Sequence, residues 1–204
     1  MSFSVRRVPP PRSPLDGAPL AGAPCEGDPV RWYEEELGWA TVPGPPVGLV
    51  TGVRFDVLEL PAEAGRAVLR RTGMGATGPV ALVGRRMRLL VAAGSAEELP
   101  GLLDWLEWGG ISLDLTAMGA GSRMTAPVPP GWSGSGAPGA AVWLRAPEPG
   151  RAVEPSLPAL RPAERADGAA PCLVRLVAAA AAECHRVRLL SARPRPTAQR
   201  LAFS

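Results

Sequence analysis

Glycine and proline divide the sequence between residues 39 and 147 into short, largely apolar segments. Apolar runs of roughly four to eight residues bounded by such turn residues are typical of β-strands. Segments with helical spacing stand among them, which favours an α+β fold with a mixed β-sheet flanked by helices. The expected strands are 39–43, 47–52, 54–60, 79–84, 86–94, 111–119, 122–131 and 140–147. The expected helices are 28–39, 61–72, 95–110 and 172–190.

The segment 95–110 carries the strongest helix signal. Ser95 and Glu98 have the spacing of a capping box, in which each side chain bonds a free backbone N–H of the first turn. Trp105 and Trp108 either extend the apolar stripe of this helix into the core or mark a surface for a partner. The stripe itself consists of Leu99, Leu102, Leu103 and Leu106.

The 204 residues suffice for one domain with a hydrophobic core. We expect a disordered Pro-rich tail over 1–27, a folded domain over 28–160, and a linker, C-terminal helix and basic tail over 161–204. The N-terminus lacks the apolar stretch of a signal peptide, and no apolar run is long enough to cross a bilayer. We therefore expect a cytoplasmic protein without membrane contact, for which association with the nucleoid is one option.

The three cysteines, Cys25, Cys172 and Cys184, have the spacing of neither a disulfide framework nor a zinc site. We therefore expect no metal and no cofactor. All 22 basic residues are arginine, and together with abundant Ala, Gly and Pro this is typical of a high-GC bacterium. Because codon usage explains the arginines, their abundance alone does not indicate phosphate binding.

Positive charge is concentrated near the C-terminus. Residues 169–204 contain six arginines and one acid, Glu183, a net charge of +5, whereas the whole chain carries only +3. Such an end either binds an acidic partner, DNA included, or keeps the tail soluble. The candidate DNA-binding residues are Arg175, Arg186, Arg188, Arg193 and Arg195.

The strand 54–60 contains two acids near its end, Asp56 and Glu59, which raises the question of a metal site. Two-metal polymerase chemistry requires carboxylates on one face, and on a strand these stand at positions i and i+2. Asp56 and Glu59 are three residues apart, so a regular strand points them to opposite faces. Their i+2 positions hold Leu58 and Pro61, which bind no metal. The local geometry therefore argues against a working pair of acids.

Longer motifs nevertheless resemble a known family. The runs WYEEELGWATVPG (32–44) and VGLVTGVRFDVLELPAEAG (47–65) are similar to the opening of the primase/polymerase domain of bifunctional primase-polymerases of the archaeo-eukaryotic primase type. GRRMRLLVAAG (84–94) resembles the Gly-rich strand that carries a His in this family. ISLDLTAMGAGSRMTAPVPPG (111–131) resembles its third motif, and AAVWL (140–144) the strand that follows. The resemblance, over residues 29–160, implies a primase/polymerase-like fold.

The chain departs from this family at the positions that carry the chemistry. Glu59 and Pro61 stand where the resemblance places the acids of an Asp-x-Asp pair, and Met87 stands near the expected nucleotide-binding His. Asp114 alone matches the third acid. The resemblance thus implies an inherited fold in which Glu59 and Asp114 are vestigial metal-site positions. We expect no catalytic residue.

These observations predict a catalytically inactive, primase/polymerase-like protein that binds DNA, a protein partner or both, in transcriptional or developmental regulation. Two other functions remain open. An interaction scaffold without a DNA role would use the Pro-rich tail and exposed tryptophans. A residual nucleotide-binding or primase-polymerase enzyme would use Glu59 and Asp114 with Mg²⁺. The tryptophans that are candidates for such exposed positions are Trp32, Trp39, Trp105, Trp108 and Trp132.

Overall fold

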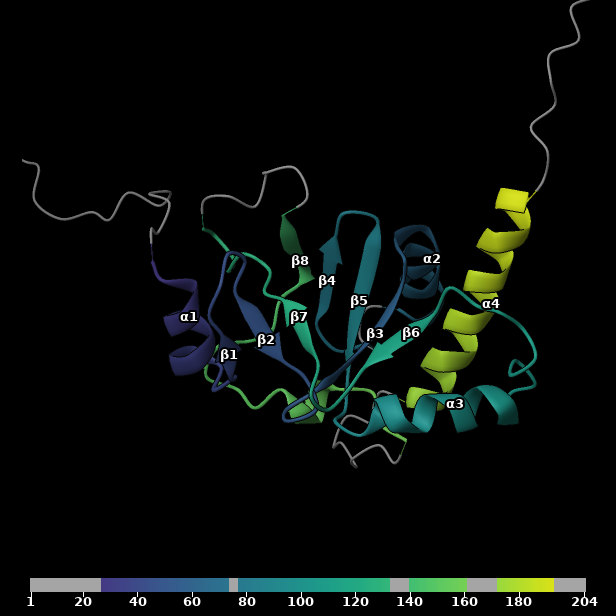
Figure 1. Ribbon diagram of the computed structural model, residues 1–204, viewed down its shortest axis with the longest axis horizontal. Helices are drawn as coiled ribbons and strands as arrows, with labels where there is room; N and C mark the ends of the chain where they lie inside the picture. The colour runs from purple at the N-terminus through teal and green to yellow at the C-terminus, as the bar shows by residue number, and fades with distance from the viewer. Residues whose placement is uncertain (1–26, 74–76, 133–139, 161–171, 193–204) are drawn as a thin grey trace, which may run out of the picture.

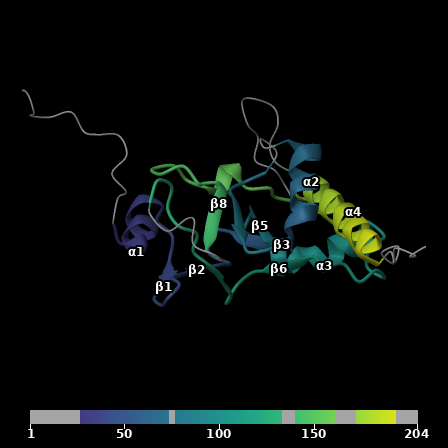
Figure 2. The ribbon, with the colours of Figure 1, turned by 90° about the horizontal axis from the view of Figure 1, so that it is seen from above.

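A computed structural model describes residues 27–73, 77–132, 140–160 and 172–192. The tail expected over 1–27 therefore lies, except for Gly27, outside the described residues. Figures 1 and 2 show three layers: an N-terminal layer with α1, β1, β2 and β7, a central sheet, and a layer of helices α2, α3 and α4. The expected α+β class, with a sheet flanked by helices, is confirmed, but the named strands pair antiparallel rather than as the expected mixed sheet.

The central sheet has the strand order β6–β3–β5–β4–β8, and neighbouring strands are antiparallel. Its strands are β3 (Asp56–Pro61), β4 (Val80–Val83), β5 (Arg86–Val91), β6 (Thr116–Met118) and β8 (Ala141–Arg145). Side chains alternate along β3: Leu58 and Leu60 join the core on the helical side, whereas Val57 joins the core on the other side. Two isolated bridges are parallel, Val128 with Val142 and Ala159 with Cys172.

The helices α2 (Ala62–Thr72), α3 (Ser95–Trp105) and α4 (Leu173–Ala192) cover one face of this sheet (Figure 2). The α2 helix approaches so closely that Gly65 has no room for a side chain, because a Cβ there would lie 2.3 Å from the Sδ of Met87 on β5. The α4 helix packs beside α2 (Figure 1). It shares one hydrophobic core with the strands, a core that includes Leu58, Leu60, Met87, Leu99, Leu176 and Val177.

The N-terminal layer covers the opposite face. Its first helix begins after Asp28, whose carboxylate accepts a hydrogen bond from the backbone N–H of Val30 at 2.9 Å. A small antiparallel sheet of order β1–β2–β7 follows. The elements of this layer are α1 (Pro29–Arg31), the π-helix η1 (Trp32–Glu36), β1 (Thr41–Val42), β2 (Gly48–Val50) and β7 (Arg123–Thr125).

Aromatic side chains fill the core between this layer and the central sheet. The Tyr33 hydroxyl is fully buried and donates a hydrogen bond to the carbonyl oxygen of Pro127 at 2.7 Å. The same hydroxyl accepts a hydrogen bond from Nε1 of Trp143 on β8 at 3.0 Å. Val153 and Leu157, which flank the short 3₁₀ helix η3 (Glu154–Ser156), complete this core.

The capping box predicted for Ser95 and Glu98 is wrong. Ser95 is the first residue of α3, and the preceding Gly94 has a left-handed backbone (φ 90°) and no capping hydrogen bond. The cap comes instead from β3, where the buried carboxylate of Asp56 accepts a hydrogen bond from the N–H of Ala96 at 2.9 Å. A carboxylate at this place also faces the positive end of the helix dipole. A tertiary contact has therefore replaced the local cap.

Candidate functional site

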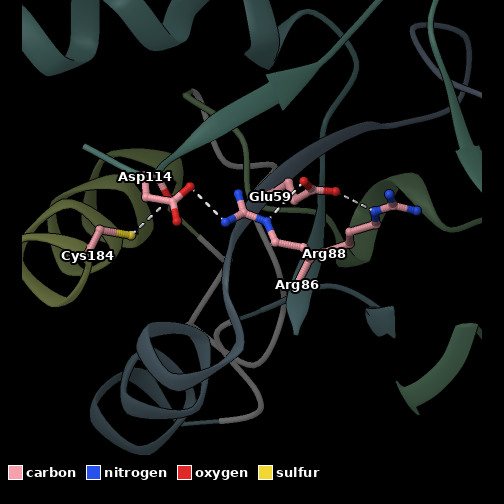
Figure 3. Close-up of polar contacts among 5 residues, drawn as sticks. All are labelled: Glu59, Arg86, Arg88, Asp114 and Cys184. Atoms are coloured by element: carbon pink, nitrogen blue, oxygen red, sulfur yellow. Dashed lines mark hydrogen bonds and ion pairs between the residues drawn. The ribbon is translucent and has the colours of Figure 1, made fainter. Parts of the chain in front are cut away.

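Glu59, near the end of β3, is held by two arginines of the neighbouring strand β5 (Figure 3). The antiparallel register places Arg88 directly opposite Glu59 and Arg86 opposite Pro61, so all lie on one face of the sheet. Nε of Arg88 lies 2.7 Å from Oε2 of Glu59, and Nε of Arg86 lies 3.1 Å from Oε1. Both oxygens of this carboxylate are therefore engaged by guanidinium groups.

Arg86 also reaches Asp114, so that one guanidinium bridges two carboxylates (Figure 3). Nη1 of Arg86 lies 2.7 Å from Oδ1 of Asp114, which lies two residues before the start of β6. The structure thus brings together the two positions expected to be vestigial, with Arg86 between them. Their exposure differs, because the side chain of Glu59 is 18% exposed and that of Asp114 is 60% exposed.

We call Glu59, Arg86, Arg88 and Asp114 the 59/114 cluster. Partial burial disfavours the charged form of Arg86, but hydrogen bonds with Asp114 and Glu59 outweigh this effect and raise the pKa of the guanidinium. The planar guanidinium remains charged at all relevant pH values, and its fork of N–H donors suits carboxylate oxygens. Two acids and two arginines make the cluster electrically neutral, and a cation that binds Glu59 would have to displace an arginine from one of its oxygens.

Among the described residues, the other potential metal-binding side chains do not combine with this cluster into a metal-binding group. In the part of the chain that the structure describes, no three His, Cys, Asp or Glu side chains are grouped so as to hold a metal ion. Met87, near the place where the resemblance puts a nucleotide-binding His, is buried beneath α2. His185 lies on α4, where the centre of its ring is 5.6 Å from that of Trp108. Cys184, also on α4, donates a weak hydrogen bond from Sγ to the backbone oxygen of Asp114 at 3.6 Å.

Asp56 does not belong to the 59/114 cluster. As its spacing from Glu59 predicts, it points to the opposite face of β3, where it caps α3 through Ala96. Burial raises the pKa of Asp56, and backbone N–H donors, that of Ala96 foremost, partly oppose the rise. The two acids of this strand therefore have separate roles, one in a helix cap and one in an ion-pair cluster.

The predicted DNA-binding arginines are divided by the structure. Nε of Arg186 lies 2.7 Å from Oε2 of Glu183, one turn earlier on α4, whereas Nη1 of Arg188 donates to the backbone oxygen of Ser112. Because eleven residues make about three helical turns, Arg175 and Arg186 lie on one face of α4, and Arg188 points elsewhere. Three of the five candidates are exposed on α4, namely Arg175, Arg186 and Arg188. The other two, Arg193 and Arg195, lie outside the described residues.

Sequence patterns missed Arg71, which reaches the same place from α2. Nη1 of Arg71 lies 2.9 Å from Oε1 of Glu183, so one carboxylate holds Arg71 and Arg186 on its two oxygens. The Glu183 side chain is only 7% exposed, and hydrogen bonds from Arg186 and Arg71 lower its pKa. Arg71 and Glu183 are 112 residues apart, so no local pattern relates them. The repeated arginines of α2, Arg66, Arg70 and Arg71, are the one signal that pointed to this surface.

The tryptophans expected at the surface behave differently from one another. The expectation for Trp39 is wrong, because this side chain is only 2% exposed and packs against Phe55, with ring centres 4.6 Å apart. Trp105 on α3 is 72% exposed, which favours the surface alternative over the core alternative for this residue. Partly buried are Trp32, Trp108 and Trp132.

Comparison of the chain with protein-family models, with curated proteins and with solved structures finds no match. The primase/polymerase resemblance therefore rests on the sequence motifs alone. A search of the described helices finds none that is both long and apolar enough to cross a membrane.

Proposed function

We propose that this protein is a catalytically inactive, primase/polymerase-like protein that binds DNA, a protein partner or both, in transcriptional or developmental regulation. The position of Arg86 between Glu59 and Asp114 supports the proposed lack of catalytic activity. Two-metal catalysis needs carboxylate oxygens that are free to coordinate divalent ions. In this chain both carboxylate oxygens of Glu59 and Oδ1 of Asp114 bind guanidinium groups instead.

Displacing that guanidinium is unfavourable. A metal ion on Glu59 would compete with two arginines, and one of them, Arg88, has a mostly buried side chain that is ion-paired with Glu59. Separating a largely buried charge from its partner costs far more than breaking an exposed ion pair. The ion pairs of the 59/114 cluster therefore support a structural role for the former metal-site positions.

The exposed arginines of α4 support the proposed binding of DNA. Arg175 and Arg186 lie on one face of the helix, and the acid of that helix, Glu183, is buried and paired. Contacts between such arginines and phosphates give affinity without reading bases. Sequence selectivity would then come from a protein partner bound to the same complex.

A nucleotide-incorporation assay tests the loss of catalysis. With a primed template, nucleotides and either Mg²⁺ or Mn²⁺, we expect the wild-type chain to incorporate no more label than the Asp114→Ala variant. Metal-dependent incorporation that disappears in Asp114→Ala would contradict the proposal, because it would show that Asp114 still serves a working metal site.

A mobility-shift assay tests DNA binding. We expect binding of the full chain to random-sequence duplex DNA that weakens steeply between about 50 and 200 mM salt, as counterion release requires. Binding that is insensitive to added salt, or absent at low salt, would exclude the arginine-phosphate mode.

The exposure of Trp105 favours a second candidate, an interaction scaffold without a DNA role. Large aromatic side chains, Trp among them, are enriched at protein interfaces. A pull-down from the native cell, followed by a DNA-binding assay of the recovered complex, separates the two candidates. A stable complex that is lost in Trp105→Ala and does not bind DNA would favour the scaffold.

A further inference from the structure

We propose that Arg71 and Arg186, held together by Glu183, form a clamp for phosphate groups of a nucleic-acid backbone. This inference rests on the proposed DNA binding and assigns it to one surface, where α2 and α4 meet. We call these three residues the phosphate clamp. The sequence predicts Arg186 as a DNA-binding residue, but it assigns no such role to Glu183 or Arg71.

Glu183 fixes the two arginines at a set spacing. Its Oε1 lies 2.9 Å from Nη1 of Arg71, and its Oε2 lies 2.7 Å from Nε of Arg186. The carboxylate is 7% exposed, whereas the two arginine side chains are more than half exposed. A buried anchor thus orients two cationic groups that remain accessible to a ligand.

Each guanidinium keeps donors for that ligand. A guanidinium has five N–H donors in a rigid fork, and each of these arginines bonds Glu183 through a single nitrogen. Arg71 uses Nη1 and Arg186 uses Nε, which leaves the remaining N–H groups of each fork for phosphate oxygens. Long arginine side chains normally lose conformational entropy on binding, and the shared anchor reduces that loss.

The surroundings favour a polyanion over a single acidic group. The clamp carries a net charge of +1. The other exposed charged side chains of α2 and α4 are four arginines and one acid: Arg66, Arg70, Arg175, Arg188 and Glu63. On the third helix, α3, the exposed charged side chains are acids, Glu97, Glu98 and Asp104. A chain of regularly spaced phosphates following α2 and α4 would meet several arginines and avoid α3.

The test compares two double variants that lose equal charge. Arg71→Gln with Arg186→Gln removes the clamp. Arg31→Gln with Arg151→Gln is the control, because both residues are exposed, each is ion-paired with a nearby Glu, and both lie on the N-terminal side of the central sheet. Binding of the full chain to random-sequence duplex DNA is measured by fluorescence anisotropy over a series of salt concentrations.

If the clamp binds phosphates, the two glutamine double variants should lose DNA affinity and salt dependence to different extents. Each phosphate contact contributes about 0.9 to the slope of log K against log salt, so the clamp variant should lose about 1.8 of that slope and at least tenfold in affinity near 100 mM salt. The control variant should lose much less of either quantity. The double variant Arg71→Lys with Arg186→Lys keeps both charges and serves as a control for misfolding. It should retain the salt dependence of DNA binding but bind DNA more weakly, because lysine lacks the forked N–H donors of the guanidinium.

Glu183→Gln separates a clamp from simple charge. This variant raises the net charge by one unit. If only the summed charge of the surface matters, DNA binding should become tighter. If Glu183 anchors the two arginines, DNA binding should become weaker. Tighter binding, or equal losses in the two glutamine double variants, would overturn the clamp and leave DNA binding intact. Failure of the wild-type chain to bind DNA at any salt concentration would overturn both the clamp and the proposed DNA binding.

Discussion

The carboxylate of Asp56 on β3 accepts a hydrogen bond from the backbone N–H of Ala96 at 2.9 Å, so a strand residue caps the first turn of α3. Asp56→Ala removes this cap and should lower the free energy of unfolding by about 1–2 kcal/mol. Asp56→Asn retains an acceptor oxygen and should lose less. Urea denaturation of both variants measures the difference, and equal losses would show that the hydrogen bond is not the relevant contact.

The same carboxyl group should make stability depend on pH. Burial raises the pKa of Asp56 above its ordinary value of 3.8, so the folded protein binds this proton more tightly than the unfolded chain does. The resulting stabilisation is complete below that ordinary value and is lost as the pH rises through the raised pKa. The free energy of unfolding of the wild type should therefore fall, relative to Asp56→Asn, as the pH rises from about 4. A difference that is constant with pH would contradict this assignment.

The two acids bound to Arg86 should differ in their contribution to stability. Glu59 is mostly buried and binds two arginines, so Glu59→Gln should lower the free energy of unfolding by about 2–3 kcal/mol. Asp114 is largely exposed and binds one arginine, so Asp114→Asn should cost less than about 1 kcal/mol. Chemical denaturation at neutral pH compares them, and the reverse order would mean that Arg86 is anchored chiefly by Asp114.

Replacing each of two helical glycines, Gly65 and Gly101, by alanine should change the stability of the protein in opposite directions. A Cβ on Gly65 would lie 2.3 Å from Sδ and 2.9 Å from Cβ of Met87, so Gly65→Ala should destabilise the protein by about 1–3 kcal/mol through overpacking. A Cβ on Gly101 in α3 meets nothing within 4 Å, so Gly101→Ala should stabilise it by about 0.5–1 kcal/mol through helix propensity. Thermal melts report both changes, and a stabilising Gly65→Ala would show that α2 can move away from β5.

Cysteine labelling should distinguish the two described thiols. Burial, reinforced by the negative charge of Asp114, raises the pKa of Cys184 to about 12. Because the thiolate is the reactive form, Cys184 should resist a thiol reagent at mildly alkaline pH, whereas the partly exposed Cys172 should react first. The measurement uses a Cys25→Ser background and follows each site by mass spectrometry. Rapid labelling of Cys184 in the folded protein would imply that α4 detaches from the core.

Much of the fold could be predicted because its signals are local. Gly and Pro mark the ends of the strands around β3 and β5, and the helical spacing of 61–72 matches α2 closely. The opposite orientation of Asp56 and Glu59 also follows from the two-residue period of a strand. These features depend on neighbours in the sequence, and the structure retains them.

The arrangement around Glu59 could not be predicted, because it depends on strand pairing. Nothing local indicates that Arg86 and Arg88 face Glu59 rather than solvent, or that the chain before β6 brings Asp114 to the same guanidinium. The cap of α3 illustrates the same limit, since a capping-box pattern was present at Ser95 and a distant carboxylate took its place. Each of these contacts depends on pairing between segments that are far apart in the sequence. At the start of α3 this pairing overrides a local pattern, and around Glu59 no local pattern indicates it.

The packing of α4 against β3 and β5 has a consequence for biosynthesis. Leu58, Leu60 and Met87 leave the ribosome long before Leu176 and Val177, which help to shield them. Until residues 173–184 emerge, α2 and α3 cover this side of the nascent sheet without α4, and the apolar surface that α4 later buries offers a site for chaperones or for premature self-association. Acquisition of the native state is therefore deferred until nearly all of the described chain has been translated.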